Sequence, residues 1–122
     1  MLLEIQDNYY LNIANIATYH PQSGNIKLIS QNNINLSTED NAEFMQNFLA
    51  MKSYLPGFIY GPRIVINLAF VERISIGTNK ADEEVVTVHL LNKTYYDLSD
   101  EDAKAVLKVL AKDKPRIISP HN

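Results

Sequence analysis

Histidines are the side chains best suited to acid–base chemistry near neutral pH, and this sequence has three of them. His20 lies in a predicted turn before a proline, His89 on the polar face of a predicted strand, and His121 next to the last residue. A general base needs a partner within hydrogen-bond reach, and nothing in the spacing places one beside these rings. We interpret the histidines as surface residues and assign no catalytic residue.

Carboxylates gather in two places where a cation could bind. The acidic residues within 97–102 adjoin the start of a predicted helix, as those at 39–40 do earlier in the chain. Negative charge at a helix N-terminus is favoured by the helix dipole, and its recurrence favours capping over metal binding. The acidic run 82–84 lacks the spacing of a calcium loop. With no cysteine and no Rossmann or P-loop glycine pattern, we assign no metal site and no cofactor.

Lysines form a basic stripe on the last predicted helix. Lys104, Lys108 and Lys112 follow one another at intervals of four, so they share one helix face. Cations near a helix C-terminus are favoured by the dipole, which is the structural interpretation. The functional alternative is binding of an anion or a partner.

Tyrosines could supply a stacking surface. Adjacent pairs occur at 9–10 and 95–96, and neighbouring residues of a strand face opposite ways. One tyrosine of each pair should therefore lie on a sheet face without helices. Together with Arg63 or Arg73, such a face could stack bases or dock a protein. Ordinary cross-strand packing is the alternative.

The elements that position these residues occur twice along the chain. Residues 9–49 and 64–111 share a pattern of strands ending in a helix. The segment 11–16 matches 66–71, and 34–40 matches 96–102, where both copies contain Leu-Ser followed by acids. A repeated supersecondary unit usually cannot bury its apolar face alone. The two copies are therefore expected to share an interior.

These patterns predict an α+β fold. Two tandem strand-rich repeats, each about ββββα, are expected to form one mainly antiparallel sheet with two helices on one face. Ser37 should cap a helix running to about Met51, and Ser99 a helix ending at Lys114. We expect a single domain over 1–122, with repeat one at 1–51, a connector at 52–62, repeat two at 58–114 and a tail at 115–122.

Composition limits the function classes. Apolar residues make up 46% and charged residues 20% of the 122 residues, as in soluble globular proteins. The net charge of −3 argues against a duplex-DNA binder. No apolar run is long enough to span a membrane, and the first residues do not resemble a signal peptide, so a cytoplasmic location and no membrane partner are expected.

We therefore expect a small non-enzymatic protein-interaction or regulatory module. The apolar connector should take part in a partner interface or in self-association, with a homodimer as the commonest closure. Its candidate partner-binding residues are Tyr54, Phe58, Tyr60 and Arg63.

One alternative is binding of single-stranded nucleic acid by an open sheet face, although the acidic charge disfavours it. The duplicated unit ending in a helix is similar in outline to the repeats of PUR-type and Whirly-type single-strand-binding proteins, and that resemblance implies the same alternative. A lesser alternative is a small-molecule enzyme, which would require His20 or His89 beside a carboxylate in a cleft.

Overall fold

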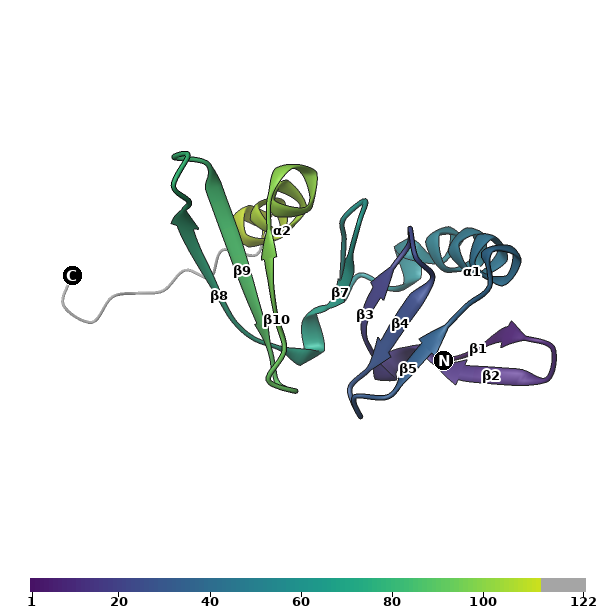
Figure 1. The fold of residues 1–122 in the computed structure, drawn as a ribbon. Helices are drawn as coiled ribbons and strands as arrows, with labels where there is room; N and C mark the ends of the chain where they lie inside the picture. Colours follow the sequence, from purple (N-terminus) through teal and green to yellow (C-terminus); the bar gives the residue numbers. More distant parts are fainter. Residues whose placement is uncertain (113–122) are drawn as a thin grey trace.

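The computed structural model describes residues 1–112 and has an α+β fold (Figure 1). Within that range it contains ten strands and two α-helices. The first half runs β1 (Leu2–Gln6), β2 (Tyr9–Asn12), the 3-10 turn η1 (Ile13–Asn15), β3 (Ile16–His20), β4 (Asn25–Leu28), β5 (Asn33–Asn35) and α1 (Thr38–Ala50). The second half follows η2 (Lys52–Tyr54) and runs β6 (Phe58–Tyr60), β7 (Val65–Asn67), η3 (Leu68–Phe70), β8 (Val71–Thr78), β9 (Glu84–Leu90), β10 (Tyr95–Leu98) and α2 (Asp100–Lys112). The predicted tail at 115–122 and the last two residues of the second repeat lie outside the described residues.

The expectation of one sheet is wrong, because the described strands form three antiparallel sheets. Their strand orders are β5-β4-β3-β7-β6, β10-β9-β8 and β1-β2. The physical reason is the pair of 3-10 turns, which change the direction of the chain between β2 and β3 and between β7 and β8. Each turn is closed by an asparagine: Asn12 Oδ1 accepts from the Ala14 N–H, and Asn67 Oδ1 accepts from the Ala69 N–H. The strands on either side of each turn therefore enter different sheets.

The first core lies under α1. Ser37 Oγ accepts from the Asp40 N–H at 3.1 Å and caps this helix, as predicted. Phe44 and Phe48 are buried against Tyr19, whose hydroxyl donates to Asn41 Oδ1. Burial raises the pKa of Tyr19 to about 12, so the hydroxyl stays protonated as a donor.

The second core lies under α2. Ala103 and Val106 of this helix are buried with Val86, Val88 and Leu90 of β9. The apolar face of α2 is therefore turned toward the sheet over the first two turns of the helix. The cores interlock, because the α1 cluster includes residues of β6 and β7 while the α2 cluster includes Ala17 of β3.

Strands β3 and β7 join the two halves. Thr18 pairs with Ile66 and Tyr19 pairs with Val65 in antiparallel register. Beside this ladder the Asn67 Nδ2 donates to the carbonyl of Ile16 at 2.9 Å. The hairpin β6-β7 thus extends the meander β3-β4-β5 into the five-stranded sheet.

The connector packs against this junction. Phe58 is buried, and the Tyr60 hydroxyl donates to the carbonyl of Leu55 at 2.9 Å. Only part of the segment is covered, since Tyr54 in η2 is 78% exposed. Neither α1 nor α2 is long and apolar enough to cross a membrane, and these are the α-helices of the described range.

Candidate functional site

The structure places the four predicted partner-binding residues in different surroundings. Phe58 belongs to the first core, where its ring meets Phe48 edge-on at 5.5 Å. Tyr60 lies beside it on β6, 6.2 Å between ring centroids, and is partly exposed. Tyr54 projects from η2, and the backbone N–H of Arg63 donates to Asp102 Oδ1 at 3.0 Å. Phe58 and Tyr60 are thus neighbours on β6, Tyr54 lines a surface groove together with Phe58, and Arg63 lies in the turn after β6.

A groove runs between β6 and α2, and we call it the α2 groove. It has a volume of about 310 Å³. One wall comes from η2, the connector and β6, and the other from successive turns of α2. Its lining residues are Lys52, Pro56, Phe58, Tyr60, Ala105, Lys108, Val109 and Lys112.

The charge of the α2 groove is positive. Lys108 and Lys112 stand one turn apart on α2, and Lys52 stands on the opposite wall with its Nζ 4.9 Å from the Tyr60 ring centroid. That distance permits a cation–π interaction, which holds the ammonium over the ring. Partial burial raises the pKa of Tyr60, so its hydroxyl remains a neutral donor to the backbone. The groove therefore combines an apolar, aromatic floor with a cationic rim.

The sequence analysis named residues from both walls of this groove but did not predict that they lie together. Phe58 and Tyr60 came from the apolar connector, and Lys108 and Lys112 came from the helical stripe. Lys52 was missed, because an isolated lysine between a helix and an apolar segment carries no pattern. Only the packing of α2 against β6 brings these residues together.

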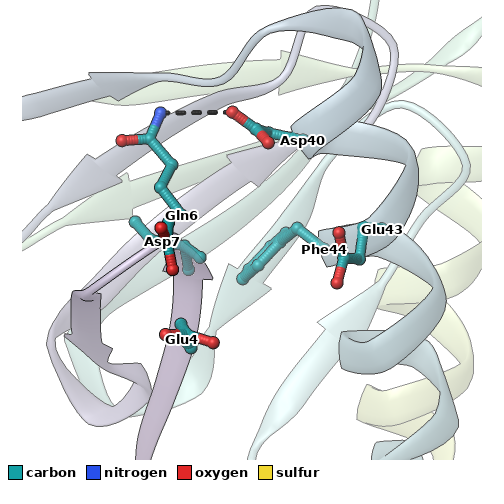
Figure 2. Close-up of a pocket in the computed structure, with 7 residues that line it drawn as sticks. Glu4, Gln6, Asp7, Asp40, Glu43 and Phe44 are labelled. Carbon is teal, nitrogen blue, oxygen red and sulfur yellow. Dashed lines mark hydrogen bonds between the residues drawn. The ribbon is translucent and has the colours of Figure 1, made fainter.

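A second groove, between β1 and α1, is acidic (Figure 2). It has a volume of about 290 Å³ and is lined by Glu4, Ile5, Gln6, Asp7, Asp40, Glu43 and Phe44. The Gln6 amide donates to Asp40 Oδ2 at 3.4 Å across it. Over residues 1–112 no group of three or more acidic, histidine or cysteine side chains is arranged to hold a metal ion. The carboxylates that line this groove give it a negative surface charge.

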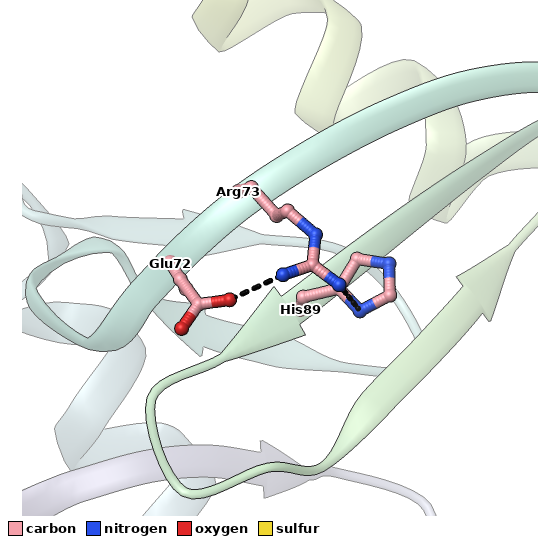
Figure 3. Close-up of polar contacts among 3 residues, drawn as sticks. All are labelled: Glu72, Arg73 and His89. Carbon is pink, nitrogen blue, oxygen red and sulfur yellow. Dashed lines mark hydrogen bonds and ion pairs between the residues drawn. The ribbon is translucent and has the colours of Figure 1, made fainter.

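A row of polar side chains crosses the exposed face of the sheet β8-β9-β10. Arg73 pairs with the carboxylate of Glu72 and approaches His89 Nδ1 at 3.4 Å (Figure 3). The His89 ring stacks with Tyr95 at 5.8 Å, with 29° between the planes. Tyr96 faces the other way, toward the Thr18 hydroxyl at 3.4 Å. The exposed Tyr95 thus occupies the helix-free face expected for one member of the pair.

His20 and His89, which the enzyme alternative places beside a carboxylate, have other neighbours in the structure. His20 is partly buried beside the Tyr96 ring, 5.7 Å between centroids. Burial and then the charge of Lys27 lower the pKa of His20, while Asp102 acts in the opposite direction. In the part of the chain that the structure describes, neither His20 nor His89 hydrogen-bonds to a carboxylate. The two grooves and the polar row are candidate binding surfaces.

Comparisons with known proteins found no match to this chain among family models, curated proteins or solved structures.

Proposed function

We propose that this chain is a small non-enzymatic protein-interaction module, built from two copies of one structural unit, that binds an acidic segment of a partner protein in the α2 groove. The observation that carries the proposal is the meeting of Lys52, Lys108 and Lys112 around the partly exposed Tyr60. The apolar floor would receive a hydrophobic side chain, and the lysines would pair with flanking carboxylates. Charge complementarity of this kind favours fast and selective association.

The order of elements supports the two-copy architecture. Each half runs through a hairpin, a 3-10 turn, a three-stranded meander and a helix. Both α-helices contain 13 residues. Each helix also contacts the first strand of its own hairpin, α1 with β1 and α2 with β6.

Strand register gives more specific support. In the hairpins, Leu3 opposite Leu11 corresponds to Ile59 opposite Ile66. The first strands of the two meanders have their irregularities at corresponding places, between Ile16 and Thr18 and between Val71 and Arg73. Independent folds would not be expected to repeat such details.

Polar contacts recur as well. The Asn25 amide donates to Asn35 Oδ1 across β4 and β5, and the Thr87 hydroxyl donates to Asp97 Oδ1 across β9 and β10. The turn residues Gln31 and Lys93, each at φ 73°, occupy the corresponding β4-β5 and β9-β10 connections. The two-copy proposal thus rests on pairing, turns and side-chain contacts together.

Peptide binding tests the α2 groove. The probe is a short fluorescent peptide of alternating glutamate and leucine, titrated with the protein at low salt and followed by anisotropy. We expect saturable binding that Lys108→Glu/Lys112→Glu weakens by at least about tenfold, because charge reversal replaces attraction with repulsion. The matched control is Lys80→Glu/Lys93→Glu, which makes the same charge change outside the groove. Absence of binding, or equal loss in both variants, would contradict the proposal.

The polar row favours a second candidate, binding of single-stranded nucleic acid. Tyr95 offers an exposed ring stacked on the partly buried ring of His89, and Arg73 offers a cation beside them. Base stacking on such rings is tolerant of sequence. Under this alternative an oligothymidylate should bind with strong salt dependence, and Tyr95→Ala/Arg73→Ala should abolish binding. Unchanged affinity of that variant for the oligonucleotide would remove this candidate.

A further inference from the structure

We infer that a second copy of this chain docks head to tail, its β1-β2 hairpin completing the sheet β10-β9-β8 of the first copy at β8. The inference rests on the two-copy architecture proposed above. Within one chain, β7 pairs with β3 and so adds the hairpin β6-β7 to the first meander. In the described range, β8 pairs only with β9 and β2 only with β1. Within residues 1–112, β8 is therefore an unpaired sheet edge at the place where β3 is covered by a hairpin, and β1-β2 is a hairpin of the kind that covers it.

These two surfaces lie at opposite ends of the molecule (Figure 1). The hairpin β1-β2 stands at one end, beyond β5, while β8 forms the outer edge of the sheet at the other end. The hairpin of one copy therefore cannot pair with β8 of the same copy. Contacts between unlike surfaces of identical chains are heterologous and generate rings or open chains. The expected assembly is therefore a head-to-tail series rather than a two-fold homodimer.

Exposed apolar residues of the hairpin match buried residues at the junction between the halves. Leu2 is 68% exposed, whereas Phe58 at the corresponding place in β6 is 8% exposed. Tyr10 is 60% exposed, whereas Val65 at the corresponding place in β7 is 1% exposed. The hairpin β1-β2 thus leaves open the side chains that the hairpin β6-β7 buries against the first meander and α1.

The surface on β8 and α2 that would receive the hairpin also exposes residues whose counterparts in the first half are buried. Phe48 of α1 is buried against the ring of Phe58 at 5.5 Å, while Leu110 at the corresponding place in α2 is exposed. Tyr19 of β3 is buried, while Ile74 in β8 is only partly buried. Docking of the hairpin of another copy would place its Leu2 against Leu110. Apolar surface left open on both sides would be removed from water together.

The side-chain amide of Asn12 could also donate hydrogen bonds across the proposed contact, as that of Asn67 does between the halves. Asn67 Nδ2 donates to the carbonyls of Ile16 and Ala14, at 2.9 and 3.3 Å, while its Oδ1 closes η3. Asn12 closes η1 through its Oδ1 in the same way. In the docked assembly its Nδ2 would reach the carbonyls of Val71 and Ala69 in the other copy.

The internal pairing fixes the expected register. Thr18 opposite Ile66 corresponds to Arg73 of one copy opposite Leu11 of the next. Tyr19 opposite Val65 corresponds to Ile74 opposite Tyr10. The new strands would be antiparallel, like β3 and β7.

Charge distribution acts in two directions. The hairpin end carries the acidic groove with Glu4 and Asp7, and α2 at the receiving end carries lysines, so the ends attract. Glu72 and Arg73, however, stand where the first half has the buried Ala17 and Thr18. Charged side chains on a strand edge oppose pairing with another strand. The contact between copies must therefore be weaker than the contact between halves.

Sedimentation velocity from about 1 µM to about 1 mM tests the inference, a range that covers association free energies down to about −4 kcal/mol. We expect the average sedimentation coefficient of the wild-type chain to rise with concentration. Glu72→Ala/Arg73→Thr, which installs the residues of the first half, should tighten association by about tenfold or more. The control Lys80→Thr/Glu83→Ala likewise removes one positive and one negative charge, but in the β8-β9 loop, and should leave association unchanged.

Tyr9→Lys/Tyr10→Lys, which places lysines on the exposed hairpin, should abolish association, and a thermal unfolding curve verifies its fold. Wild-type protein that stays monomeric throughout, or association that survives the tyrosine substitutions, would overturn the inference. The acidic-peptide titration of Tyr9→Lys/Tyr10→Lys separates the two proposals, since loss of self-association with intact peptide binding leaves the α2 groove standing. Failure of the wild-type chain to bind the peptide would count against the groove alone.

Discussion

The side-chain amide of Asn67 donates to the backbone carbonyl of Ile16 at 2.9 Å, across 51 positions of sequence. Asn67 is only 5% exposed, and its Oδ1 simultaneously accepts from the Ala69 N–H. One side chain therefore closes the turn η3 and attaches the second half to the first.

Replacing Asn67 should lower stability more than replacing its counterpart. Asn67→Ala leaves buried backbone groups without partners, at a cost of about 1–3 kcal/mol. Asn12→Ala removes the matching turn contact at a more exposed place, so we expect a smaller loss. Urea unfolding of both variants measures the difference. Equal losses would contradict the bridging role of Asn67.

Gly61 should not tolerate a side chain. A Cβ there would lie 2.3 Å from Asp102 Oδ1, the atom that accepts from the Arg63 N–H. Gly61→Ala must displace this buried carboxylate, and we expect a loss of about 2 kcal/mol or more. Gly57→Ala is the control, since no atom lies within 4 Å of its Cβ. A loss of similar size in both variants would show that the contact with Asp102 is unimportant.

His20 should make stability depend on pH. Because its pKa is lowered from the ordinary 6.5 in the folded chain, the unfolded chain binds more protons between the two values, and stability falls as pH decreases below about 6.5. His20→Gln should reduce the drop in Tm between pH 7.5 and pH 5.5, while the control His89→Gln, at a histidine on the polar face of the β8-β9-β10 sheet, is compared over the same interval. An unaltered pH profile in His20→Gln would contradict the assignment.

Replacing Phe58 should lower the free energy of unfolding. Phe58→Ala opens a cavity among Phe48, Tyr60 and the rest of the first core, at a cost of about 3–5 kcal/mol. Tyr54→Ala, at a side chain 78% exposed, should change the unfolding free energy by less than about 0.5 kcal/mol. Chemical denaturation distinguishes the two. A neutral Phe58→Ala would mean that the β6 contact with α1 is unimportant.

Sequence patterns predicted local structure well and tertiary grouping poorly. The cap at Ser37 and the opposite faces of Tyr95 and Tyr96 follow from local rules, and both are present. The division into three sheets was missed, because Asn12 and Asn67 end strands through side-chain contacts that leave the hydrophobic alternation unbroken.

The candidate site was missed for a different reason. Lys52 and Lys108 line one groove only because α2 packs on β6. Glu4 and Glu43 line another only because α1 packs beside β1. Both groupings depend on packing between elements far apart in sequence. The spacing of residues along the chain does not predict them.

Disulfide trapping between copies tests the central claim most directly, namely that the chain repeats one unit and presents a complementary edge and hairpin to other copies. The chain has no cysteine, so proteins carrying only Tyr10→Cys or only Ile74→Cys can be mixed under mild oxidation. Residues directly opposite in antiparallel strands have Cα atoms about 4.5–5.5 Å apart, which suits a disulfide. We predict a mixed dimer in clear excess over that formed when Lys80→Cys replaces Ile74→Cys. Equal yields from the two mixtures would contradict the claim.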